Sequence, residues 1–223
     1  MKVALAQLSY IPGDIAGNSS KIIAAIRQAR DGGAELAIFS ELAVTGYPPL
    51  DLLLRSDTIT ASMAAVTEIA SHCKGIAAIV GSPSPNTGVY GKSLHNSAFL
   101  LAEGKVRAVI HKTLLPTYDI FDEDRYFQPG NHFGAVSLNG HKIAVTICED
   151  IWDEQPFGDK GLWRLYSVSP LDEIMKEKPS LIINIAANPF SHNRIAVREE
   201  VFVRNAREFK VPLVSVNQTG GYT

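Results

Sequence analysis

Three reactive side chains, a carboxylate, an ammonium and a thiol, each follow an apolar stretch of strand length. They are Glu41, Lys112 and Cys148. In α/β proteins, functional groups gather beyond the carboxyl ends of strands, because the loops there converge over the sheet. The sequence therefore predicts that these three side chains lie along one rim.

Together these groups could carry out acyl transfer. A thiol with an ordinary pKa of about 8.5 is mostly protonated at neutral pH and needs a nearby cation or base. Lys112 could supply the cation, and Glu41 could accept the proton. The oxyanion of such a reaction also needs donors, for which the Lys112 ammonium and the backbone N–H of Glu149 are suited. Cys148 would then be the nucleophile.

Each of these residues also has a structural interpretation. A single cysteine in an apolar strand is commonly a buried thiol, a glutamate that leaves a strand commonly caps a turn, and a lysine there is commonly solvated. The second cysteine, Cys73, is expected to be a small, semi-buried residue late in a helix. The residue types alone leave both interpretations open.

Several familiar motifs are absent from the sequence. No strand is followed by the Gly-x-Gly-x-x-Gly fingerprint, no Gly-x-Ser-x-Gly elbow occurs, and the six histidines lack metal-ligand spacing. Gly91-Lys92-Ser93 imitates the end of a P-loop, but Asn86 stands where that motif requires glycine. These absences argue against a dinucleotide, phosphate or zinc site.

The composition predicts a soluble globular protein. The chain has 223 residues with 46% hydrophobic and 20% charged residues, which excludes disorder as its main state. Its net charge is −2 and its basic residues form no stripe, which argues against nucleic acid or an anionic membrane as partner. No apolar run could span a bilayer, and no signal peptide is evident. We therefore expect a cytoplasmic protein.

Apolar periodicity predicts helices between strands at both ends of the chain and hairpins in the middle. Helices are expected from a cap at Asn18 to Gly32-Gly33, from a cap at Asp57 to Lys74, and over 195–209. Strands are expected over 3–9, 36–40, 76–81, 181–186 and 212–216, with a Pro/Gly-rich loop before Ser93. Hairpins are expected over 96–111 and 133–147. This pattern favours an α/β fold with helices covering one mixed sheet or two sheets.

Three segments that contain the reactive residues resemble motifs of the nitrilase (carbon–nitrogen hydrolase) superfamily. These segments are 40–53 (SELAVTGYPPLDLL), 112–127 (KTLLPTY and then FDEDRYF) and 147–152 (ICEDIW). The Gly-Tyr-Pro-Pro form is typical of one branch, the glutaminase domains of glutamine-dependent NAD synthetases. With the strand around Gln7 and the segment 188–190, the resemblance covers essentially the whole chain.

The resemblance implies a four-layer α-β-β-α sandwich over residues 1–223, truncated before its last strands. It implies a triad in which Glu41 is the general base and acid, Lys112 stabilises the oxyanion and Cys148 is the nucleophile. Glu123 matches the second glutamate that braces the lysine in this superfamily.

The resemblance also implies substrate contacts. Tyr118 would contact glutamine, and Arg194 falls at a substrate-binding basic position. Asn188 stands where many relatives have a serine, which leaves its contact open. In structural terms, Arg194 could be a solvated residue at a helix start and Asn188 a turn residue before Pro189.

The implied reaction is hydrolysis of the side-chain amide of L-glutamine through a cysteine thioester, with no metal or organic cofactor. In the full-length family protein, the released ammonia passes to a C-terminal synthetase domain, which uses ATP and Mg to make NAD from nicotinic acid adenine dinucleotide. The loop typical of that domain is absent from this sequence. The implied partners are L-glutamine, the synthetase domain and further copies of the chain in a homo-oligomer.

Two alternatives remain open. The chain could be a stand-alone amidase of the same superfamily that acts on another small amide, although the branch-specific motifs argue against this. It could also be a catalytically silent subunit that docks a synthetase, which the presence of all three triad residues disfavours. A redox protein is a more distant alternative, because no Cys-x-x-Cys occurs.

Overall fold

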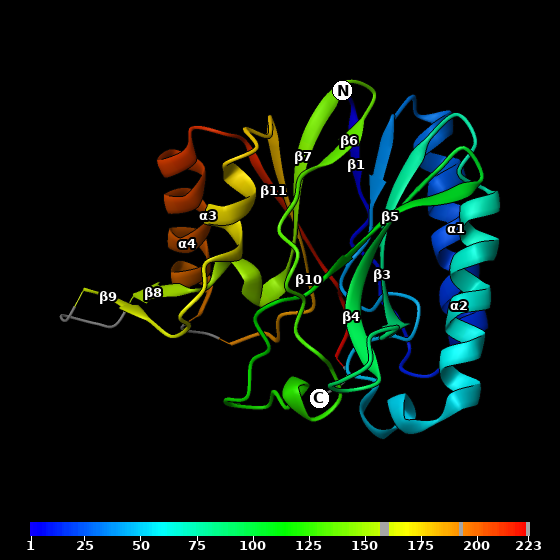
Figure 1. The fold of residues 1–223 in the computed structure, drawn as a ribbon. Helices are drawn as coiled ribbons and strands as arrows, with labels where there is room; N and C mark the ends of the chain where they lie inside the picture. Colours follow the sequence, from blue (N-terminus) through cyan, green and yellow to red (C-terminus); the bar gives the residue numbers. More distant parts are fainter. Residues whose placement is uncertain (157–160, 192–193, 222–223) are drawn as a thin grey trace.

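Two β-sheets pack face to face in the computed structural model, and helices cover the outer face of each (Figure 1). The layers follow one another as helices, sheet, sheet and helices. This is the four-layer α-β-β-α sandwich that the resemblance implies, and it agrees with the helix-covered sheets predicted from the sequence pattern. The structure describes residues 1–156, 161–191 and 194–221.

The N-terminal sheet has the strand order β1-β2-β3-β4-β5. Its first three strands are parallel to one another, whereas β3, β4 and β5 are antiparallel neighbours. Two helices, α1 and α2, cover its outer face (Figure 1). The bounds are β1 (Val3–Leu5), α1 (Ile15–Asp31), β2 (Leu36–Ile38), α2 (Ser56–Ser71), β3 (Ala77–Pro85), β4 (Leu94–Ala102) and β5 (Lys105–His111).

The C-terminal sheet has the strand order β11-β10-β7-β6. The central strand β10 is parallel to β7 and β11, and β6 pairs with β7 as an antiparallel hairpin. Helices α3 and α4 cover its outer face, and a small hairpin, β8 with β9, projects beside them (Figure 1). The bounds are β6 (Val136–Leu138), β7 (His141–Ile147), β8 (Glu154–Pro156), β9 (Leu162–Arg164), α3 (Pro170–Met175), β10 (Leu181–Ala186), α4 (Arg194–Phe209) and β11 (Leu213–Asn217).

Apolar side chains fill all three spaces between the layers. On β2, Leu36 and Ile38 pack between the two sheets, whereas Ala37 packs against α1 and α2. Successive side chains of a strand point to opposite faces, so a strand that is buried on both faces has a continuous apolar sequence. A further cluster of buried residues packs α3 and α4 on the C-terminal sheet.

Most predicted elements are present, with shifted ends. Both hairpins form where they were predicted, the second around Asn139-Gly140 with both residues at positive φ. The first strand is shorter than expected, ending at Leu5, and α2 ends at Ser71 instead of Lys74. The β8–β9 hairpin and α3 were not predicted.

The expected helix caps at Asn18 and Asp57 were wrong. Asp14 caps α1 by accepting from Gly17 N at 2.9 Å, and α2 begins at Ser56, before Asp57. Asn18 is instead fully buried inside α1. Its side chain accepts from Ile11 N at 3.0 Å and donates to Ile11 O and Val44 O. Asn18 therefore holds the loop that follows Glu41 rather than the start of a helix.

The expected loop before Ser93 is partly strand, because β3 continues to Pro85. Pro83 and Pro85 pair with Asn96 and Leu94 on β4, but β2 pairs with β3 only as far as Ile79. Beyond Ile79 one side of β3 has no strand partner in these pairings, so a proline there removes no ladder hydrogen bond on that side.

Cys73 is fully buried rather than semi-buried, in the turn after α2. Its thiol lies 3.5 Å from Ile69 O, and burial raises its pKa to about 12. This environment is that of an unreactive structural thiol.

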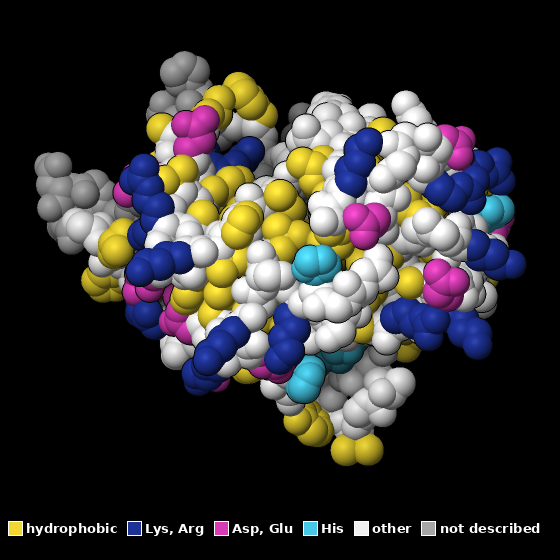
Figure 2. Space-filling view, turned by 90° about the horizontal axis from the view of Figure 1, so that it is seen from above, with side chains coloured by type: hydrophobic (Ala, Val, Ile, Leu, Met, Phe, Trp, Pro, Cys, Tyr) yellow, Lys and Arg dark blue, Asp and Glu magenta, His cyan; other side chains and the backbone are white. Residues whose placement is uncertain are grey.

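Charged side chains of both signs are interspersed on the face shown in Figure 2, and apolar side chains gather near its middle. Lys and Arg form no continuous surface on that face. Of the helices in the described part of the chain, none combines the length and apolar character needed to cross a membrane.

Replacing Asn18 should destabilise the fold. Asn18→Ala leaves the Ile11 backbone amide and the Val44 carbonyl without their side-chain partner, which should lower the free energy of unfolding by about 1–3 kcal/mol. Ser20→Ala on the exposed side of the same helix should change it by less than about 0.5 kcal/mol. Equilibrium unfolding in urea measures both, and equal effects would contradict the role of Asn18.

Candidate active site

The three reactive residues follow the carboxyl ends of strands in both sheets. Glu41 lies three residues after β2, Lys112 directly follows β5, and Cys148 directly follows β7. Glu41 and Lys112 therefore come from the N-terminal sheet and Cys148 from the C-terminal sheet. The candidate site lies where the two sheets meet.

The Lys112 ammonium lies between two buried carboxylates. Its Nζ is 2.7 Å from Glu41 Oε1 and 2.7 Å from Glu123 Oε2. The side chain of Lys112 is 0% exposed, and those of Glu41 and Glu123 are 1% and 5% exposed. Two carboxylates around one ammonium leave an excess of one negative charge if all three groups are ionised. Such a cluster can accept a proton from a neighbouring acid.

Further donors hold the two carboxylates in place. Glu41 Oε1 also accepts from Asn96 Nδ2 at 2.7 Å, and Glu41 Oε2 accepts from Ala187 N at 3.0 Å. Glu123 Oε1 accepts from the Tyr47 hydroxyl at 3.1 Å. These donors fix the orientation of both carboxylates relative to the ammonium.

A glycine permits the turn that carries Glu41. A Cβ on Gly81 of β3 would lie 2.4 Å from Leu42 N and 2.4 Å from Ser40 O, so only glycine fits against this backbone. Gly81 O accepts from Val44 N at 3.1 Å. Leu42 has a positive φ of 47°, which is a strained conformation for a residue with a side chain.

The protonation states of the ion-paired groups follow from burial and mutual charge. Burial alone would lower the pKa of Lys112, but the charges of Glu123 and Glu41 outweigh it and hold that pKa well above its ordinary value. Burial raises the pKa of Glu123 to about 7 against the opposing charge of Lys112. The lysine is therefore a stable cation.

Cys148 is buried and occupies a strained turn. It begins a 3-10 helix, Cys148–Ile151, with a positive φ of 47°. Its thiol donates to Asn188 Oδ1 at 3.3 Å, and Asn184 Nδ2 donates to the Cys148 carbonyl at 3.2 Å. Burial, reinforced by the charge of Glu41, raises the pKa of this thiol well above its ordinary value. The resting thiol is therefore protonated, although Lys112 opposes that shift.

The segment 187–188 connects the carboxylate to the thiol. Ala187 N donates to Glu41 Oε2, and the neighbouring Asn188 side chain accepts from Cys148. The backbone of Asn188 is held in turn by Asn217, through bonds of 2.7 and 3.0 Å. The side chain of Asn188 thus lies at the Cys148 thiol.

Glu149 follows Cys148 in the first turn of the short helix, where backbone N–H groups have no acceptor within the helix. Its carboxylate is buried and accepts from the hydroxyls of Tyr118 and Tyr166, each at 2.9 Å. Burial raises the pKa of Glu149.

The predicted substrate contacts lie together in one recess. Tyr118, Glu149, Asn188 and Arg194 all line it. Arg194 begins α4, with its guanidinium 3.8 Å from an Asp119 carboxylate oxygen and 5.7 Å from the centroid of the Tyr118 ring. The structure therefore brings all of the predicted site residues into one region.

Several residues of this region were missed by sequence reasoning. The sequence predicts Asn96 only as a strand residue, although a polar amide inside an apolar strand is a signal of a buried hydrogen-bonding role. Tyr47 lies in the glutamate motif, but no role was assigned to it. Asp150 accepts from the backbone amides of Thr113, Leu114 and Ile147, each within 3.0 Å, and so links the lysine and cysteine segments.

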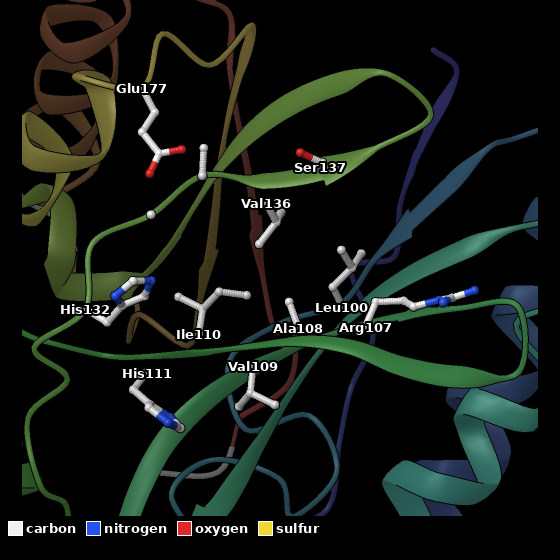
Figure 3. A pocket seen from close by; sticks show the side chains of 12 residues that line it. Leu100, Arg107, Ala108, Val109, Ile110, His111, His132, Val136, Ser137 and Glu177 are labelled. Atoms are coloured by element: carbon white, nitrogen blue, oxygen red, sulfur yellow. The ribbon is translucent and has the colours of Figure 1, made fainter.

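A separate cavity of about 440 Å³ opens between β5 and β6 (Figure 3). Its lining includes His111 and His132 but none of the candidate site residues. His111 directly precedes Lys112, yet its ring bonds Ser97 Oγ at 2.8 Å and stacks on His95. This cavity is therefore distinct from the candidate site. Within the described ranges, no three His, Cys, Asp or Glu side chains form a group that could hold a metal ion.

Comparisons with solved structures agree with the fold. A glutamine-dependent NAD+ synthetase from Acinetobacter baumannii, solved with ADP, matches 98% of this chain with a TM-score of 0.86 and 33% identity, over 38% of its own length. An amidase from Nesterenkonia sp. AN1 matches 99% of this chain with a TM-score of 0.78, over 79% of its own length. Its identity is 22%, so this match concerns the fold alone.

Sequence comparisons identify the family. The chain is 39% identical to a glutamine-dependent NAD(+) synthetase of Synechocystis sp. and 33% identical to one of Thermotoga maritima, covering 98% and 99% of this chain. It spans only 39% and 36% of the lengths of these two relatives. The carbon-nitrogen hydrolase model matches residues 2–155. The chain therefore belongs to the carbon-nitrogen hydrolase family.

Proposed function

We propose that this chain hydrolyses the side-chain amide of L-glutamine through a thioester on Cys148. The observation that carries the proposal is the buried Lys112 ammonium between Glu41 and Glu123, connected through segment 187–188 to the thiol. The names of the relatives support glutamine as the substrate. The proposed residues supply a nucleophile, a base and oxyanion donors, so the reaction requires no metal or organic cofactor.

The first step needs the thiol to lose its proton as it attacks. Because the resting thiol is protonated, Glu41 accepts its proton while sulfur forms a bond to the amide carbon. The carbonyl electrons move to oxygen. Two N–H groups of the Lys112 ammonium point to the carboxylates, and the third is available to this oxyanion together with the Glu149 amide.

Collapse of the tetrahedral intermediate breaks the carbon–nitrogen bond. Glu41 returns its proton to the departing nitrogen, which leaves as ammonia, and a γ-glutamyl thioester remains on Cys148. A water molecule then attacks the thioester while Glu41 accepts its proton. The carbon–sulfur bond breaks, glutamate is released, and the proton returns to sulfur. Glu41 therefore alternates between base and acid.

The same proposal assigns the remaining groups. Tyr118 contacts the glutamine substrate, and Arg194 is a basic group that binds it. Asn188 contacts the substrate beside the thiol, and Glu123 braces Lys112. Residues 1–223 act as one glutaminase domain, which supplies ammonia to an ATP- and Mg-dependent synthetase domain of the full-length polypeptide for NAD synthesis. The proposal also includes that the protein is a cytoplasmic homo-oligomer and binds neither nucleic acid nor membranes.

Two other functions fit parts of the structure. A stand-alone amidase for another small amide would share the same fold, as the Nesterenkonia amidase does. A silent docking subunit would share the fold without the chemistry. Relative turnover of glutamine and aliphatic amides separates the first alternative from the proposal. An adduct of Cys148 with a diazoketone analogue of glutamine, suppressed by glutamine, would exclude the second.

Removal of the nucleophile should abolish ammonia release from L-glutamine. Cys148→Ala should lower the rate about a thousandfold or more while leaving the circular dichroism spectrum unchanged. Cys73→Ala is the matched control, because it also removes a buried thiol, and it should leave the rate unchanged. The diazoketone analogue should form an adduct with the unmodified protein and with Cys73→Ala but not with Cys148→Ala, which intact-mass measurement would detect. Turnover that persists in Cys148→Ala would refute the thioester mechanism.

Removal of the Glu41 charge should make the thiol easier to ionise even as turnover is lost. The charge of Glu41 adds to burial in raising the pKa of Cys148, so Glu41→Gln should lower that pKa and increase the thiolate fraction at a given pH. Iodoacetamide should then alkylate Glu41→Gln faster than wild type between about pH 7 and pH 9. Both proteins would carry Cys73→Ala, and mass spectrometry would measure the rates. Slower alkylation of the variant would contradict this charge coupling.

A further inference from the structure

The cation and the thiol of the candidate site belong to different parts of the fold. Lys112 and its two carboxylate partners come from the N-terminal sheet and the loop after it, whereas Cys148 follows β7 of the C-terminal sheet. In the described part of the chain, the hydrogen bonds of the Lys112 ammonium go to those carboxylates, and that of the thiol goes to Asn188. Other contacts must therefore set the position of the ammonium relative to the sulfur.

Asp150 joins the two segments directly. Its Oδ1 accepts from Thr113 N and Leu114 N, each at 2.9 Å, and its Oδ2 accepts from Ile147 N at 3.0 Å. Thr113 directly follows the lysine in the chain, and Ile147 directly precedes the cysteine. One oxygen of this carboxylate therefore holds the backbone beside the cation, and the other holds the backbone beside the thiol.

The link requires an ionised carboxylate. Both oxygens of Asp150 face N–H donors, so an asparagine of the same shape would place its amide nitrogen against a donor on one side. Asp150 is only 3% exposed, so water cannot easily replace a lost bond. Burial raises the pKa of Asp150 to about 6, and the three backbone donors and the charge of Lys112 oppose that rise. The group is therefore mostly ionised above about pH 7.

Each segment is also fastened to its own side of the fold. Lys112 N donates to Asn96 O, and Gly130 N donates to Lys112 O, both at 2.8 Å. The cysteine directly follows β7, which pairs with β6 and β10. Loss of the Asp150 link would therefore let the ammonium and the sulfur move apart while both segments stay folded. A displacement of about 1 Å at a reacting centre can slow a reaction about 100-fold.

We propose that Asp150 is a positioning residue, which sets the Lys112 ammonium against the Cys148 sulfur and so against the oxyanion that forms there. This inference rests on the proposed glutamine hydrolysis and adds a residue that acts through the backbone of the lysine and cysteine segments. The substrate recess is held by other bonds, such as those of two tyrosine hydroxyls to Glu149. Loss of the Asp150 link therefore slows the chemical steps more than it weakens substrate binding.

Asp150→Asn should lower kcat for L-glutamine by about 10- to 100-fold while KM changes by less than about threefold. The substitution keeps the shape of the side chain and leaves one side of the link without its acceptor. Ammonia release would be measured at about pH 8, where the carboxylate of the unmodified protein is ionised. Dissociation constants of L-glutamine, measured by calorimetry in a Cys148→Ala background, should also agree within about threefold.

Asp153→Asn is the matched control. It makes the same chemical change to another buried carboxyl group, whose hydrogen bond goes to the side chain of Ser169 instead of to the lysine segment. It should leave kcat and KM within about twofold of the unmodified protein. Circular dichroism would establish that both variants are folded.

A second variant changes the link from its other end. Thr113→Pro removes one backbone donor to Asp150 but keeps the carboxylate and its charge. It should lower kcat by about 3- to 30-fold. Because both variants break the same contact, kcat of the double variant should lie within about threefold of that of Asp150→Asn alone. Losses that multiply would show that Asp150 acts independently of the lysine segment, and the inference would fall.

Each other failure has a different signature. An unchanged kcat in Asp150→Asn, an equal loss in Asp153→Asn, or a change confined to KM would each overturn the inference. If Asp150→Asn did not fold, Thr113→Pro would decide alone, and an unchanged kcat in that variant would overturn it. If the unmodified protein neither turned over L-glutamine nor, as Cys148→Ala, bound it, the proposed function itself would fail and this inference with it.

Discussion

The site depends on one buried ammonium held between two carboxylates. Taking three charges out of water is costly, and removal of one partner from such a group typically destabilises a protein by about 3–5 kcal/mol. Lys112 is compensated because Glu41 and Glu123 lie within 2.7 Å of it. The carboxylates are compensated in turn by Asn96, Tyr47 and a backbone amide. This requirement for partners is what brings the ends of several strands together.

The same cluster determines the chemistry that is available. A thiolate formed in advance at Cys148 would face the charges of Glu41, Glu149 and Glu123 in a buried environment, while Lys112 would oppose them. In the proposed mechanism, proton transfer to Glu41 at the moment of attack avoids that species, and the fixed donors around Glu41 would hold it in position for the transfer.

The positions of Glu41, Lys112 and Cys148 could be predicted because each follows a strand whose apolar sequence is continuous, and strand ends converge. Both hairpins could be predicted from their turns, Asn139-Gly140 and Glu103-Gly104, because glycine readily adopts the positive φ that both turns have. The predicted roles of Glu123, Tyr118 and Arg194 came from the resemblance to family motifs, because local patterns alone do not distinguish these residues from solvated ones.

Other features depend on contacts between distant segments and leave little trace in local sequence. Asn18 resembles a helix cap, but its buried amide serves loops at Ile11 and Val44. Pro83 and Pro85 resemble loop residues, but they extend a strand beyond the end of its neighbour. The partner of Asn96 is Glu41, which lies in a different segment of the chain.

The bond from Ala187 to Glu41 joins residues 146 positions apart in the sequence. It crosses from one sheet to the other, so the carboxylate acquires its full set of donors only after both sheets have docked. A chain emerging from the ribosome therefore cannot complete this constellation until residue 187 has been synthesised and its sheet has folded. Incomplete or half-folded polypeptides would consequently lack the assembled site.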